Sequence, residues 1–190
     1  ADLLGHVGPA LGRDEGLKVS FVTAKGGADV AKQVGAGNAS LGGGVGDTPI
    51  IETGHFPNLK TFTDNWEAIR AEVQEILKHR DAIPAFHDVS PDQHKISKGT
   101  NWRTFILFGF GEKLEKNCSQ APFTTKLLSE VPNLQTAWFS ILSPGYHIRA
   151  HRGVSKGILR AHLGLIIPKE AEKCRIRVGD VIKVWHPGEI

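Results

Sequence analysis

The chain has 190 residues and a net charge of +3, with 40% hydrophobic and 23% charged residues. This composition is typical of a soluble globular protein, and the length suits one domain plus an appendage. No apolar run approaches the roughly 18 residues needed to cross a bilayer, and the small net charge gives no argument for nucleic-acid binding. The two cysteines are far apart in the sequence, which argues against a disulfide framework or a structural zinc site. We therefore expect a soluble domain, and a cytoplasmic location is favoured.

The N-terminal segment, residues 1–49, differs in composition from the rest of the chain. It contains twelve of the 22 glycines, whose backbone entropy opposes folding, so it reads as a Gly-rich appendage or linker. A short β-rich run at 19–24 predicts one strand within it. We divide the chain into this appendage and a domain at 50–190. The lack of any methionine, including at position 1, suggests that the sequence is a fragment or a processed chain.

Two helices are expected before most of the strands. Asp64 and Glu67 have the spacing of a capping box, and apolar residues then recur at helical intervals, which predicts an amphipathic helix at about 64–80. Pro122 suits the first turn of a helix, so a second, shorter helix is expected to run from there to about Glu130.

The second half of the chain is rich in strand signals. Aromatic and β-branched residues predict strands at 102–110, 136–142 and 158–167. Two further strands, at 175–178 and 181–185, flank Gly179-Asp180, a pair that suits the two-residue loop of a type II′ hairpin. This order of elements predicts an α+β domain whose β part is a sandwich or barrel.

The strand at 158–167 has two different faces. One face is wholly apolar and consists of Leu159, Ala161, Leu163, Leu165 and Ile167. Side chains alternate between the faces of a strand, so Arg160 and His162 point together, away from the apolar face. A planar guanidinium beside an imidazole suits a ligand with carboxylates. Eight Lys or Arg residues lie between 147 and 177, against two Glu, and they add a positive local field. The alternative interpretation of Arg160 and His162 is an ordinary exposed polar strand face.

His151 is the candidate metal ligand. It lies in the segment SPGYHIRAHRG, in which a Pro-Gly turn enters a short predicted strand that ends at His151. Many non-haem iron sites place a carboxylate two residues after the first histidine, since both side chains then share one strand face. Here that position is Gly153, which has no side chain, so the simple two-histidine, one-carboxylate rule is not met.

Four stretches together resemble the aspartyl/asparaginyl β-hydroxylase family. They are HFPNLKTFTDNWEAIRAEV, NWRTFILFGFG, SILSPGYHIRAHRG and ILRAHLGLIIPKE, and the resemblance covers about residues 55–190. It implies a double-stranded β-helix, that is, a cupin-like jelly roll, with flanking N-terminal helices. It also implies an oxidoreductase that uses Fe(II), 2-oxoglutarate and O₂ to hydroxylate an unactivated C–H bond.

The resemblance also implies roles for individual residues. His151 looks like the first iron ligand, while Ser140, Arg160 and His162 look like contacts to 2-oxoglutarate. Trp102 is a candidate for the substrate cleft, although a strand Trp is more often part of a core. The pattern His151-Arg152-Gly153 matches the peptide-modifying branch of the family, in which Gly replaces the iron carboxylate.

The chain departs from the family at its C-terminal end. The second iron histidine and the 2-oxoglutarate-binding arginine of the family follow the hairpin, whereas this sequence stops at Ile190. We therefore expect an incomplete domain that lacks the second iron ligand and leaves a barrel edge open. His186 lies in a turn before the missing strand and is not accepted as the ligand.

The favoured substrate is the β-carbon of Asp or Asn in a peptide or protein, and neither a nucleic acid nor a transmembrane segment is expected. Three alternatives stay open. They are a lipid A acyl-chain hydroxylase of the same family, a non-catalytic jelly-roll binding module, and a cupin-type metalloenzyme that does not use 2-oxoglutarate.

Overall fold

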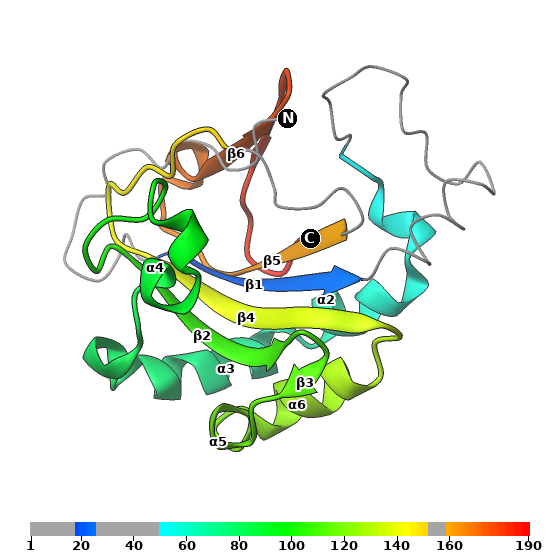
Figure 1. The fold of residues 1–190 in the computed structure, drawn as a ribbon. Helices are drawn as coiled ribbons and strands as arrows, with labels where there is room; N and C mark the ends of the chain where they lie inside the picture. The colour runs from blue at the N-terminus through cyan, green and yellow to red at the C-terminus, as the bar shows by residue number, and fades with distance from the viewer. Residues whose placement is uncertain (1–17, 26–49, 152–158) are drawn as a thin grey trace.

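The computed structural model describes residues 18–25, 50–151 and 159–190. Its main feature is a five-stranded sheet in the order β3-β2-β4-β1-β5, in which every neighbouring pair is antiparallel (Figure 1). The strands are β1 (Lys18–Lys25), β2 (Trp102–Gly109), β3 (Glu112–Lys113), β4 (Leu134–Leu142) and β5 (Leu159–Ile166). A separate two-stranded sheet consists of β6 (Arg175–Val178) and β7 (Val181–Val184).

Helices pack against one face of the five-stranded sheet. Figure 1 shows α3 and α6 along this face, with α5 beside them. The α-helices are α2 (Lys60–Asp64), α3 (Trp66–Leu77), α4 (Phe86–Val89), α5 (Glu115–Cys118) and α6 (Pro122–Ser129). Short 3-10 turns are η1 (Thr53–His55), η2 (Pro57–Leu59), η3 (Arg80–Ala82), η4 (Pro91–Gln93) and η5 (Ala171–Lys173). The predicted α+β class is confirmed, while the closed jelly roll stays a prediction.

The main hydrophobic core lies between these helices and the sheet. On the helix side, Ile69 and Val73 of α3 are fully buried, as is Phe62 of α2. On the sheet side, alternate residues such as Phe139 and Leu163 point into the same cluster. The apolar face predicted for β5 is therefore the face that packs on the helices, because period-two alternation matches the burial pattern.

The helix predicted at about 64–80 is α3, which begins at Trp66 and ends at Leu77, and the short α2 precedes it. Asp64 ends α2, where its carboxylate accepts hydrogen bonds at 2.6 and 2.7 Å from the Nζ of Lys60. Asn65 then separates α2 from α3, and its side chain donates to the carbonyl of Thr61 rather than capping the next helix. The predicted capping box with Glu67 is therefore wrong, because Asp64 belongs to the preceding turn and is paired there.

The other predicted elements are confirmed with small shifts at their ends. The helix that starts at Pro122 ends at Ser129, and β2, β4 and β5 lie where aromatic and β-branched residues predicted them. Gly179 has φ of +58°, as the first residue of a type II′ loop requires. The strand predicted at 19–24 is β1, although it lies within the predicted appendage. The division of the chain at 49/50 stays a prediction.

No helix among the described residues is long and apolar enough to cross a membrane.

Glu72 joins the two helices that cover the sheet. From α3, its carboxylate accepts hydrogen bonds from the backbone N–H groups of Phe123 and Thr124 at 2.7 and 2.9 Å. It also accepts one from the hydroxyl of Thr124 at 2.6 Å. These amides belong to the first turn of α6, and the N–H groups in the first turn of a helix have no acceptor within the helix. An acidic side chain here therefore satisfies donors and complements the helix dipole.

We expect Glu72→Ala to lower the free energy of unfolding by about 2 kcal/mol, because hydrogen bonds to a charged group are lost and two amides lose their acceptor. Urea denaturation followed by circular dichroism measures this change. Glu75→Ala is the matched control, since its carboxylate only pairs with Lys78 at the surface and such pairs contribute about 0–1 kcal/mol. Equal effects of the two substitutions would contradict the role of Glu72.

Candidate functional site

The sheet face opposite α3 and α6 carries Trp102, Ser140, Arg160 and His162, which are residues that the sequence predicted for the site. Across the sheet, Trp138 of β4 pairs with Val22 of β1, which pairs with His162 of β5. Residues directly opposite one another share a face, as do residues two apart along a strand. This face, called the site face below, is defined by Trp102, Thr104, Trp138, Ser140, Arg160 and His162. The register thus brings Ser140 onto the same face as Arg160 and His162.

Ser140 is held by an aromatic neighbour. The Nε1–H of Trp102 donates to the Oγ of Ser140 at 3.0 Å, and both residues are buried. Phe86 stacks on Trp102 with a centroid separation of 3.8 Å. A serine hydroxyl that accepts a bond still has its own proton to donate. Trp102 therefore orients the hydroxyl as well as lining this end of the site face.

Arg160 supplies a permanent cation. Its guanidinium carbon lies 5.8 Å from the centroid of the Trp138 ring. Partial burial lowers the pKa of Arg160 from its ordinary value, although the residue keeps exposed surface. An arginine is protonated at neutral pH even after such a shift. Beside it on β5, the His162 ring meets the edge of Trp185 with a centroid separation of 5.4 Å.

Two buried polar atoms of the site face lack a hydrogen-bond partner among the described residues. They are the Oγ1 of Thr104 and the Nε1 of Trp138. Buried donors of this kind cost free energy unless a ligand or water satisfies them. The Trp138 ring lies beside the Arg160 guanidinium, and Thr104 lies opposite Ser140 on the same face. Donors and a cation on one face match the chemistry of a ligand with carboxylate oxygens, so the residues present fit 2-oxoglutarate.

Thr104 and Trp138 were not predicted as site residues. A signal was available for Trp138, because Thr136, Trp138 and Ser140 alternate with apolar residues along β4, but β2 shows no such alternation around Thr104. The sequence does not say which strands are neighbours, and the pairing of Thr104 with Ser140 is what places these residues together.

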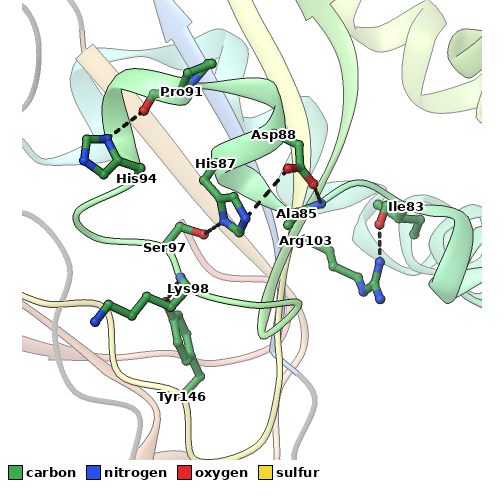
Figure 2. Close-up of polar contacts among 10 residues, drawn as sticks. All are labelled: Ile83, Ala85, His87, Asp88, Pro91, His94, Ser97, Lys98, Arg103 and Tyr146. Atoms are coloured by element: carbon green, nitrogen blue, oxygen red, sulfur yellow. Dashed lines mark hydrogen bonds and ion pairs between the residues drawn. The ribbon is translucent and has the colours of Figure 1, made fainter.

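His151 follows a segment that is anchored to the body of the domain. Ile148 is only 2% exposed, and the Tyr146 hydroxyl donates to the carbonyl of Ile96 at 3.1 Å. The same hydroxyl accepts a bond from the backbone N–H of Lys98 at 3.2 Å (Figure 2). The Nδ1 of His151 lies 2.8 Å from the carbonyl of Arg149. A carbonyl only accepts, so Nδ1 carries the proton and Nε2 of the neutral ring has the lone pair that a metal needs.

Within the part of the chain that the structure describes, the remaining ligands of an iron site are not found with His151. No group of three or more His, Cys, Asp or Glu side chains that could hold a metal occurs in residues 18–25, 50–151 and 159–190. These residues alone therefore do not fit iron, and we derive no catalytic step through it. Gly153, which stands where many iron sites have a carboxylate, lies outside the described residues.

A second polar cluster lies beside the site face and is structural. The Nδ1 of His87 is 3.0 Å from the Oγ of Ser97, and its Nε2 is 3.7 Å from the carboxylate of Asp88 (Figure 2). Although the residue types are those of a hydrolase triad, Ser97 is only 2% exposed, so its hydroxyl is inaccessible to a substrate. Asp88 also accepts from the backbone N–H of Ala85 at 3.2 Å, which holds the start of α4. This cluster keeps residues 85–98 in place next to Trp102.

The C-terminal residues cover part of the outer edge of β5. The N–H of Gly164 donates to the carbonyl of Glu189 at 2.9 Å, and the N–H of Gly188 donates to the carbonyl of Gly164 at 2.8 Å. The expected open edge is thus covered at this point. The side chain of His186 is exposed, while its carbonyl packs over Gly164.

Comparison with known proteins identifies the family. A sequence model described as aspartyl/asparaginyl beta-hydroxylase matches residues 63–190. The chain belongs to this family. It is 41% identical to the ornithine lipid ester-linked acyl 2-hydroxylase of Rhizobium tropici over 145 residues, which is 76% of this chain and 52% of that protein. It is also 31% identical to the aspartyl/asparaginyl beta-hydroxylase of Homo sapiens over 144 residues, or 73% of this chain and 18% of that protein.

The chain spans about half the length of the R. tropici protein and less of the human one. A third relative, the aspartate beta-hydroxylase domain-containing protein 2 of Xenopus tropicalis, is 31% identical over 69% of this chain and 35% of its own length. The family match includes β2, β4 and β5, which supply the site face, but it does not include β1.

Proposed function

We propose that this member of the aspartyl/asparaginyl beta-hydroxylase family takes part in hydroxylation that depends on iron(II), 2-oxoglutarate and O₂. The observation that supports this best is the site face. There a guanidinium lies on the same sheet surface as a positioned serine hydroxyl and two buried donors without partners among the described residues. Such a set suits a dicarboxylate, which is the cosubstrate that the family resemblance implies.

The described residues would bind and orient the cosubstrate. Arg160 would pair with one carboxylate through its planar fork, and Ser140, fixed by Trp102, would donate to a carboxylate oxygen. His162 would lie beside them, with its ring packed against that of Trp185. Bound iron and 2-oxoglutarate would supply the oxidising chemistry. These roles for Ser140, Arg160 and His162 are proposals.

An acyl chain of a lipid is the substrate class that we favour over the predicted peptide. The identity of 41% to a protein named as an acyl 2-hydroxylase exceeds the 31% to the human aspartyl/asparaginyl beta-hydroxylase. In addition, one face of the β6–β7 hairpin combines two cations and two apolar side chains, all exposed: Arg175, Arg177, Ile182 and Val184. Cations next to aliphatic side chains suit an anionic lipid surface.

A peptide substrate remains the second candidate. The pattern His151-Arg152-Gly153 resembles the peptide-modifying branch of the family. The positive residues between 147 and 177 would also attract an acidic peptide.

The test is release of succinate from 2-oxoglutarate, with iron(II) and ascorbate present and the flanking coding sequence included. We expect release to rise with an ester-linked lipid, whose acyl chain gains the mass of one oxygen atom. A response only to Asp- or Asn-containing peptides would support the second candidate. No succinate with any substrate, together with no binding of 2-oxoglutarate, would refute the enzyme and favour a non-catalytic binding module. Turnover that does not need 2-oxoglutarate would favour the cupin-type alternative.

His151→Ala is expected to abolish turnover and to weaken binding of Co(II), used as a spectroscopic substitute for iron, at least tenfold. The physical reason is the loss of Nε2, the nitrogen that would coordinate the metal when the Nδ1–H is bonded to the carbonyl of Arg149. Isothermal titration with Co(II) measures the binding separately from activity. His94→Ala is the control, since that exposed ring is bonded to the carbonyl of Pro91. Unchanged turnover in His151→Ala would remove this residue from the metal site.

A further inference from the structure

Trp102 belongs to a small apolar cluster that is separate from the main core. Three of its members are buried and three are partly buried: Trp102, Leu142 and Ile148, then Phe86, Ile96 and Tyr146. The cluster joins the segment 86–98 to the start of β2, the end of β4 and the residues that follow β4. We propose that Phe86 is a positioning residue, which acts through Trp102 to hold the Ser140 hydroxyl in place for 2-oxoglutarate. This inference rests on the proposed function where it concerns that ligand.

The indole of Trp102 is covered on one face by an aromatic ring. Phe86 stacks on it with a centroid separation of 3.8 Å and an angle of 17° between the two ring planes. The χ2 torsion of an aromatic side chain is broad, so the plane of the indole is set by the groups that pack on its faces. That plane decides whether the Nε1–H of Trp102 points at the Oγ of Ser140, which lies 3.0 Å from Nε1, because misaligned hydrogen bonds weaken steeply. The stack therefore controls a hydrogen bond that Phe86 does not make itself.

The backbone on the N-terminal side of Phe86 is attached to β2. The N–H of Thr104 donates to the carbonyl of Pro84 at 3.1 Å, and Ala85 forms an isolated antiparallel bridge with Arg103. These β2 residues directly follow Trp102 in the sequence. The ring of Phe86 thus approaches the indole from backbone that is fixed to the same strand.

The C-terminal side of the segment is held by a phenol. The Tyr146 hydroxyl donates to the carbonyl of Ile96 at 3.1 Å and accepts a bond from the N–H of Lys98 at 3.2 Å (Figure 2). The structural polar cluster beside the site face joins this stretch back to α4. With both sides attached, the ring of Phe86 has little freedom to leave the indole. Tyr146 is therefore a second positioning residue, one step further from Ser140.

This arrangement affects the ligand more than the stability of the fold. The Ser140 hydroxyl accepts the indole N–H, so its own proton remains available for a carboxylate oxygen. Phe86 is only partly buried and lies outside the main core, so shortening its side chain removes little of the packing that stabilises the domain. Loss of the ring should therefore weaken binding of 2-oxoglutarate while the domain stays folded.

Phe86→Leu is the first test, because leucine keeps an apolar side chain but cannot stack. In the chain with its flanking coding sequence, we expect the Kd for 2-oxoglutarate to rise about tenfold by isothermal titration. The thermal midpoint should fall by no more than about 4 °C. Phe86→Tyr keeps a stacking ring and should bind within twofold of the parent. Phe123→Leu is the matched control, since that partly exposed ring lies on α6, on the other side of the sheet, and its loss should leave the Kd unchanged.

A double-mutant cycle shows whether Phe86 acts through Trp102. Trp102→Phe keeps a ring but has no N–H, so it should weaken binding by itself. In that background we expect Phe86→Leu to change the Kd by less than twofold, because the bond through which Phe86 acts is already absent. Effects that simply multiply would overturn the proposal, as would parent affinity in Phe86→Leu.

Tyr146→Phe removes a single hydroxyl and serves even if Phe86→Leu does not fold. The Ile96 carbonyl and the Lys98 N–H lose their shared partner, so the segment is held less firmly. We expect the Kd for 2-oxoglutarate to rise about threefold, with no further rise when Trp102 is also replaced by Phe. An unchanged Kd in Tyr146→Phe would contradict the role of the segment.

The indole N–H signal of Trp102 in an NMR spectrum reports the same hydrogen bond without any ligand, and its absence in Trp102→Phe assigns it. We expect this proton to exchange with solvent at least fivefold faster in Phe86→Leu and in Ser140→Ala than in the parent chain. Equal exchange in Phe86→Leu and the parent would refute the positioning role. If the parent chain binds no 2-oxoglutarate, the proposed function fails, while the exchange rate still decides whether Phe86 holds the indole.

Discussion

Replacing Arg160 with Ala is expected to weaken 2-oxoglutarate binding about 100-fold, which corresponds to about 2.7 kcal/mol. Removing one partner of a close charged pair costs about 2–5 kcal/mol, since the other charge loses its counterion in a partly desolvated site. Arg160 is the cation of the site face, where it lies over Trp138 and shares its strand surface with His162. Isothermal titration with 2-oxoglutarate, or with a non-reactive analogue, measures the change without turnover.

Two further variants make this result specific. Arg160→Lys keeps the charge but loses the planar fork, so we expect an intermediate loss of affinity. Arg175→Ala removes an exposed guanidinium from the β6–β7 hairpin and is expected to leave the Kd for 2-oxoglutarate unchanged. Affinity loss of the same size in Arg160→Ala and Arg175→Ala would show that only the general positive field matters. Unchanged affinity in Arg160→Ala would remove this residue from the cosubstrate site.

Gly164→Ala is expected to lower the free energy of unfolding by about 3 kcal/mol, the upper part of the range for overpacking a tight site. A Cβ built on Gly164 would lie 2.3 Å from the carbonyl oxygen of His186. That oxygen belongs to the backbone, and the segment is tied to Gly164 by two hydrogen bonds of 2.8 and 2.9 Å. The added methyl group must therefore displace the C-terminal turn or the edge of β5.

Thermal and urea unfolding measure this loss, and another glycine provides the control. A Cβ added to Gly54 would meet no atom within 4 Å, and Gly54 does not have a positive φ, so Gly54→Ala should leave stability nearly unchanged. Because Gly164 occupies the β5 position two residues after His162, the variant should also weaken 2-oxoglutarate binding. Full stability in Gly164→Ala would show that residues 186–189 do not pack on β5 in solution.

Local patterns in the sequence were sufficient for most single elements. The alternation of apolar and polar residues along 158–167 predicted both the strand and the common face of Arg160 and His162, because side-chain direction in a strand follows from the backbone alone. The hairpin around Gly179 was likewise predicted from the φ that its turn requires. The capping box was predicted wrongly, since Asp64 met a partner in the preceding turn that its spacing to Glu67 did not reveal.

The site depended on pairings between distant segments, which leave little trace in local sequence. The run at 19–24 predicted a strand, yet nothing in it indicated a place between β4 and β5. Thr104 and Trp138 joined the site face only through the register of β2 with β4, and the C-terminal turn reached Gly164 across the edge of β5. The sequence alone determined which strands form and which way their side chains point, because that is set by neighbouring residues. Only the tertiary structure decided which strands lie side by side, because hydrogen bonding between strands is nearly independent of side-chain identity.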